Sequence, residues 1–227
     1  MRVLAIPNSI LASPSAILSR LVSEPGLFID NSGATLTEAF LGFLFGFAIG
    51  IAAAIATVES RLFERTFYPI FVTSQVIPTF ALAPLLVLWL GFGLEPKIVI
   101  IVLWVFFPIT VNMVKGLKSA DPGVIALMRS CRASRFQLLR FVQIPASLPY
   151  LFAATQLAVT YAVLGAVFVE WFGALKGLGK LMLVGAYRQT DLMLASVVLV
   201  SILALVLFVG VRLVARLAMP WLRASGK

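Results

Sequence analysis

LMLASVVLVSILALVLFVGVRLV, residues 192–214, is the stretch that decides the fold of this chain. Its one charged residue, Arg212, lies near the end of the run. A helix of about 20 predominantly apolar residues crosses the hydrocarbon core of a bilayer, and its backbone groups satisfy one another. The stretch therefore predicts a membrane-spanning helix.

Four further apolar runs precede it, at residues 36–58, 67–90, 98–114 and 150–172. Across the chain of 227 residues, 61% are hydrophobic and 12% are charged, and the mean hydropathy is +1.07. A soluble domain of this size cannot bury that much apolar surface. We therefore predict an all-α polytopic bundle with about five spanning helices.

Glycines and prolines predict how two of these helices are built. A proline inside a spanning helix kinks or breaks it, and the second run contains Pro69, Pro78 and Pro84. A glycine at every fourth position makes a smooth stripe that a neighbouring helix can approach closely. The first run carries such a helix-packing stripe at Gly42, Gly46 and Gly50.

The net charge of +9 reflects basic residues that gather between the apolar runs. Two of the 18 lie between the first and second runs, six between the third and fourth, and four at the end of the fifth run or after it. Basic loops face the cytoplasm, so these segments predict a cytoplasmic C-terminus. Because no soluble segment combines aromatic and basic stripes, we expect a lipid bilayer partner and no nucleic acid.

The alternation of apolar runs with basic segments divides the chain into three parts. Residues 1–35 are expected at the outer side, with Ser13–Val22 as a short amphipathic helix at the interface. Residues 36–214 form the transmembrane domain, and 215–227 form a cytoplasmic tail.

The loop at residues 115–149 is too long and too apolar for a simple connector. Asp121 followed by Pro122 predicts the start of one short helix. Ser134 predicts the cap of a second, Arg135–Val142, ending before Pro145. Short helices with an apolar face dock on the membrane, on their own bundle or in the groove of a partner protein.

DPGVIALMRSCRASRFQLLRFVQIPASLPYL, residues 121–151, resembles the cytoplasmic loop of binding-protein-dependent ABC importer permeases. That family's pattern is Glu-Ala-Ala, three residues, Gly, nine residues and Ile-x-Leu-Pro. The spacing is intact, although the acidic position is Ala126 and the glycine position is Arg132. The resemblance implies that this loop couples the chain to an ATPase through Ala126, Leu127, Met128, Arg129, Arg132, Ala133, Ser134, Arg135, Phe136 and Pro145.

Residues 76–101, 106–112 and 170–181 are similar to the nitrate, sulfonate and taurine group of the same family, with a leaning toward carriers of thiamine-pyrimidine precursors. Members usually have six spanning helices, and the first is expected to be absent here. The resemblance implies a bacterial inner-membrane importer that pairs two permease copies with ATPase subunits and an extracytoplasmic solute-binding protein.

ATP and magnesium are expected on a partner chain, with no cofactor in this one. The Gly179-Lys180 dipeptide has Ala174 and Leu181 where a phosphate-binding loop needs Gly and Ser or Thr, so it is interpreted as part of an outer-side turn. The chain has no histidine and one cysteine, Cys131. Without a cluster of nucleophile, base or metal ligands, neither a metal site nor an enzyme is predicted.

Polar residues inside apolar runs are the candidates for the translocation pathway, because such groups face protein or water. They are Gln75, Thr79, Asn112, Gln156 and Tyr161, each of which could instead serve interhelical hydrogen bonding. Glu170, at the outer end of the fourth run, is a further candidate, and pairing with Lys176 or Lys180 is its simpler interpretation.

Two alternatives remain open at this point. An ATP-independent secondary carrier or channel would need ions or acids at the membrane midplane and often an internal repeat, and neither is evident. A decayed, inactive permease would explain both the expected loss of a first helix and the altered coupling loop.

Overall fold

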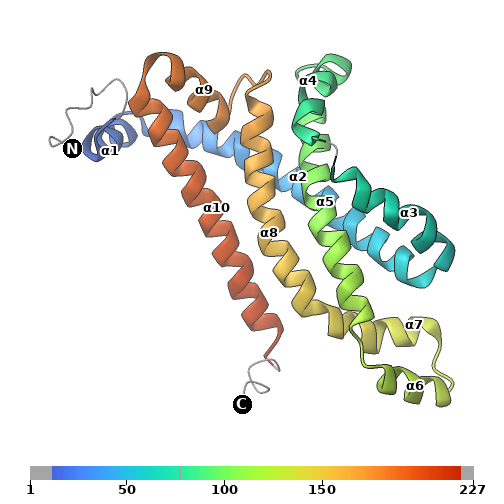
Figure 1. Cartoon of the computed structure of the whole chain (residues 1–227). Coiled ribbons are helices and arrows are strands. Elements are labelled where there is room, and N and C mark those ends of the chain that lie inside the picture. Colours follow the sequence, from blue (N-terminus) through green and yellow to red (C-terminus); the bar gives the residue numbers. More distant parts are fainter. Residues whose placement is uncertain (1–11, 77, 221–227) are drawn as a thin grey trace.

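The computed structural model describes residues 12–76 and 78–220, and within these ranges all regular secondary structure is helical, with no strand (Figure 1). The elements in chain order are α1 (Pro14–Ser23), α2 (Pro25–Glu59), α3 (Arg61–Ser74), α4 (Thr79–Leu90), α5 (Glu95–Lys118), α6 (Pro122–Ser130), α7 (Arg135–Leu138), the π-helical segment η1 (Leu139–Gln143), α8 (Ile144–Glu170), α9 (Leu178–Arg188) and α10 (Thr190–Ala218).

Four helical stretches in the described residues are long and apolar enough to cross a membrane: α2, α5, the continuous α7–η1–α8, and α10. They contain the first, third and fifth apolar runs, and the fourth up to Glu170. The all-helical membrane fold is thus confirmed.

The second run differs from the expected single span. It is divided between α3 and α4, with a turn at Gln75 and Val76 and extended backbone at Pro78. Proline has no N–H to donate to the preceding turn and disfavours helix in the residue before it, which explains the break. α4 alone, at 12 residues, is shorter than a spanning helix.

The glycine stripe of α2 packs against α5. A Cβ atom added at Gly46 would lie 2.8 Å from the Val105 Cβ and 3.0 Å from the Val102 carbonyl oxygen. One added at Gly50 would lie 2.9 Å from the Ile109 Cγ2, and Gly42 faces Ile101 in the same way. The two backbones therefore approach so closely that side chains fit on α5 only.

Figure 1 shows how the ends of the bundle differ. α6, α7 and the end of α10 lie at one end, while α1, α4 and α9 lie toward the other. The predicted interfacial helix is α1, capped by the Ser13 hydroxyl, which accepts from Ala16 N. α2 already begins at Pro25, so the expected domain boundary after residue 35 falls inside a helix.

Some expectations fall on residues outside the described ranges. These are the first part of the 1–35 segment and the end of the 215–227 tail.

Candidate functional site

The predicted coupling loop, residues 115–149, forms two short helices, each with a side-chain cap. Asp121 accepts a hydrogen bond from Gly123 N at 2.7 Å and begins α6. Ser134 and Gln137 cap α7 reciprocally, each side chain accepting from the other residue's backbone N–H. A reciprocal cap satisfies two otherwise free donors, so α7 can form although it is short.

Arg132 occupies a backbone position that favours glycine. Its φ is 55°, the one positive φ among described non-glycine residues. Ala133 N donates to Met128 O and Arg132 N to Arg129 O, the bonding pattern of a Schellman helix end. A side chain in this left-handed conformation costs roughly 1 kcal/mol relative to glycine. The geometry thus gives a physical reason for the glycine in the family pattern.

Most of the residues expected to couple to an ATPase are exposed. Leu127 is 64% and Phe136 66% exposed, and α6 has no buried residue. Met128 and Ala133 are partly buried, whereas Ala126, Arg129, Arg132, Ser134, Arg135 and Pro145 are exposed.

The expected end of the second short helix before Pro145 is wrong. The helix widens into η1, where Ile144 N donates to Leu139 O, and then continues as α8. Proline is tolerated in the first turn of a helix because its missing N–H would have no partner there. The coupling loop is therefore joined to a spanning helix by one uninterrupted helical path.

A cavity of about 440 Å³ lies between α5, α8 and the α3–α4 turn, and four of the predicted pathway residues line it. The Trp104 indole N–H donates to the Thr79 hydroxyl at 2.7 Å. None of the described lining residues is charged: they are Gln75, Thr79, Leu103, Trp104, Phe107, Pro108, Val111, Asn112, Leu157, Tyr161 and Leu164.

The other two predicted pathway residues lie elsewhere. Gln156 is partly buried on α8 and does not line the cavity. Glu170 is fully buried and pairs with neither Lys176 nor Lys180. Instead, its carboxylate accepts from the Thr35 hydroxyl at 2.6 Å and from Gly179 N at 2.5 Å.

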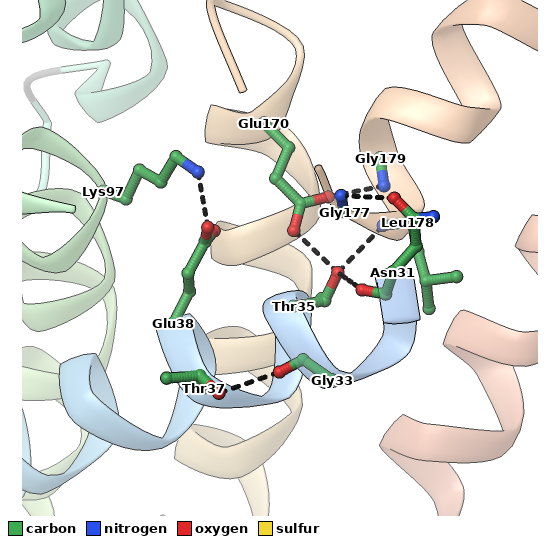
Figure 2. Close-up of polar contacts among 10 residues, drawn as sticks. All are labelled: Asn31, Gly33, Thr35, Thr37, Glu38, Lys97, Glu170, Gly177, Leu178 and Gly179. Carbon is green, nitrogen blue, oxygen red and sulfur yellow. Dashed lines mark hydrogen bonds and ion pairs between the residues drawn. The ribbon is translucent and has the colours of Figure 1, made fainter. Parts of the chain in front are cut away.

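Glu170 belongs to a buried polar network at the start of α9, drawn in Figure 2. Gly177 N donates to the Asn31 side chain at 2.7 Å and Leu178 N to the Thr35 hydroxyl at 2.9 Å. With Gly179 N on Glu170, three N–H groups at the N-terminus of α9 are satisfied by side chains of α2 and α8. The expected outer-side turn is thus partly the first turn of a helix.

A second buried pair, which was not predicted from the sequence, lies beside this network. Lys97 lies in the first turn of α5 and donates to Glu38 of α2 (Figure 2). Both residues are buried, at 8% and 2% exposure. Glu38 lies in an apolar run, so its charge alone indicated a partner, although the sequence does not say which one.

A membrane-spanning helical bundle with a solute-sized cavity and exposed short helices at one end is the architecture of a membrane transport subunit. The chain belongs to the family described as binding-protein-dependent transport system inner membrane component, whose model matches residues 46–223. It is the transmembrane permease subunit of an ABC importer, and the family implies ATPase and substrate-binding partners.

The chain is similar to several permeases over most of its length. It is 38% identical to a probable ABC transporter permease protein of Haemophilus influenzae, covering 91% of this chain and 85% of that one. Identity is 33% with the formylaminopyrimidine transport permease protein ThiX of Halalkalibacterium halodurans (93% and 86% covered) and 30% with the taurine transport system permease protein TauC of Escherichia coli (93% and 80% covered).

The fold is also that of a solved transporter. The MetNI methionine ABC transporter, in an inward-facing conformation, matches with a TM-score of 0.75 at 22% identity, over 86% of this chain and 97% of that one.

Proposed function

We propose that two copies of this chain face each other in a bacterial plasma membrane and form the pathway of an importer. ATP and magnesium bind to separate ATPase subunits, an extracytoplasmic binding protein delivers the solute, and the C-terminus is cytoplasmic. The observation that carries this proposal is the exposed pair α6 and α7, whose apolar side chains Leu127 and Phe136 fit the groove of a partner protein.

The helical path from α7 to α8 supplies the mechanical link. A displacement of α7 by the ATPase reaches η1 and then α8, because no loop interrupts them. α8 contributes Leu157, Tyr161 and Leu164 to the cavity. Closure of the ATPase subunits therefore changes the cavity wall directly, as in other two-state switches.

The cavity lining supports an uncharged, flat heterocycle as the cargo. Trp104, Phe107 and Tyr161 offer aromatic surfaces to a ring. Asn112 and Gln75 offer amide groups for hydrogen bonds, whereas a sulfonate would enter a lining without a balancing cation. The similarity to the formylaminopyrimidine permease agrees with this choice over the taurine-like cargo.

Co-purification tests the proposed coupling. We expect an ATPase subunit to be retained on this chain in mild detergent, and Phe136→Ala to lose it, since a truncated apolar anchor weakens a docked helix by about 2 kcal/mol or more. The matched control is Phe141→Ala, because Phe141 is 61% exposed but lies in η1, beyond α7.

Two results would contradict the coupling proposal. Equal retention with both variants would remove the role of α7. No ATPase with the unaltered chain would favour an ATP-independent carrier or a decayed permease.

Uptake in cells that carry the complete transporter tests the cargo. We expect a labelled pyrimidine to be imported and labelled taurine to be excluded. Tyr161→Ala should lower pyrimidine uptake about fivefold, since it removes an aromatic contact worth about 1 kcal/mol. Tyr187→Ala is the control, because Tyr187 is 81% exposed on α9 and away from the cavity. Import of taurine instead of the pyrimidine would refute the cargo assignment.

A further inference from the structure

A second cleft, of about 590 Å³, lies between the α2–α3 corner and the coupling helices. Three arginines line it, together with Glu59 and a few uncharged residues. Its volume is within the roughly 300–1,000 Å³ of small-ligand sites. The arginines come from three helices, α3, α6 and α7, and are Arg61, Arg129 and Arg135.

The positive charge of this cleft is not neutralised within the described residues. None of the ion pairs among the described residues includes Arg61, Arg129 or Arg135. Glu64 also interacts with Arg61, but Lys118 donates to the Glu64 carboxylate and is the main reason that its pKa is lowered. Three arginine cations and one carboxylate, Glu59, leave an excess of positive charge that attracts an anion. Arginine pairs well with phosphate.

The cleft is on the side of α6 that faces away from the exposed apolar residues. Ile125 and Arg129, four residues apart, share the face that lines the cleft. Val124 and Leu127 lie on the opposite side of the helix and are 43% and 64% exposed. The apolar surface proposed for the ATPase and the arginine cleft are therefore different faces of α6, although Arg129 and Arg135 of the cleft were also expected among the coupling residues.

The cleft also lies where a membrane surface would be. α2, a spanning helix, ends at Glu59, and α3 starts at Arg61. α3 leaves large apolar side chains uncovered, with Leu62 at 78% and Ile70 at 54% exposure. An amphipathic helix of this kind lies in the lipid interface, and basic pockets at the cytoplasmic ends of spanning helices bind anionic headgroups.

We propose that the arginine cleft binds the phosphate of an anionic phospholipid from the cytoplasmic leaflet. The assignment to that leaflet rests on the proposed orientation of the chain. The bound headgroup contacts α3 and both coupling helices, and so links the membrane surface to the segment that moves with the ATPase.

Native mass spectrometry of the transporter, purified through a tag on this chain and returned to lipid mixtures, tests this site. We expect phosphatidylglycerol to be retained over phosphatidylcholine. Arg61→Gln should lower phosphatidylglycerol affinity about fivefold, the effect of one basic residue at an anionic surface. Arg65→Gln is the matched control, since Arg65 is exposed on the same helix but does not line the cleft.

Each other outcome overturns the proposal. Equal retention by the two variants, or of the two lipids, removes the site. Full competition by inorganic phosphate would make it a free-phosphate site, and loss of lipid when the ATPase is present would make it an ATPase contact. ATPase retention is measured separately in the same samples, so failure of lipid binding is distinguishable from failure of the proposed coupling.

Discussion

Gly46→Leu is expected to force α2 and α5 apart and to destabilise the bundle by about 3 kcal/mol. Even a Cβ at this position would lie 2.8 Å from the Val105 Cβ and 3.0 Å from the Val102 carbonyl oxygen. The Val102 backbone cannot rotate away as a flexible side chain would. A detergent-solubilised variant should therefore lose its folded peak in size-exclusion chromatography about 5–10 °C below the unaltered protein.

Gly33→Leu is the matched control because it makes the same change in the same helix. A Cβ at Gly33 would meet nothing within 4 Å. Leucine is also the better helix former, so this variant should be as stable as the unaltered chain or slightly more so. If both variants lost their folded peak at the same temperature, close packing of α2 against α5 would not be what stabilises the bundle.

The spanning helices were predictable because their signal is local. A run such as residues 192–214 has one low-energy structure in a bilayer, whatever surrounds it. The division of residues 67–90 into two helices was only partly predictable. Pro69 and Pro84 stay inside helices, whereas α3 ends before Pro78. Which proline breaks a helix depends on packing, and the sequence does not state that.

The functional regions were predictable only where their sequence signal is local. The caps at Asp121 and Ser134 are local, and both were found. Gln75, Asn112 and Tyr161 were selected for their polarity alone, and only the fold shows that they meet in one cavity. The predicted partner of Glu170 was wrong, because the actual partner, Thr35, is far away in sequence whereas Lys176 and Lys180 are near.

Thr35→Val is expected to destabilise the protein by about 2–3 kcal/mol. The Thr35 hydroxyl donates to the Glu170 carboxylate and accepts from Leu178 N, and the residue is fully buried. Valine has nearly the same shape, so the packing is kept while both bonds are lost (Figure 2). A buried N–H and a carboxylate oxygen are then left without this partner, and the α9 N-terminus should loosen. Thermal unfolding and hydrogen exchange at Leu178 measure the two effects.

Thr37→Val provides the control within the same turn of α2. The Thr37 hydroxyl is exposed and donates to the carbonyl of Gly33 in its own helix (Figure 2). Its loss should change stability by less than about 0.5 kcal/mol and leave exchange at Leu178 unaltered. A Thr35→Val protein as stable and as well protected as Thr37→Val would show that α9 is held by its apolar contacts alone. A Thr35→Val protein that is less stable and less protected than Thr37→Val would show that polar side chains of α2 and α8 hold the start of α9. The close packing of α2 against α5 then fixes where the α2 side chains lie.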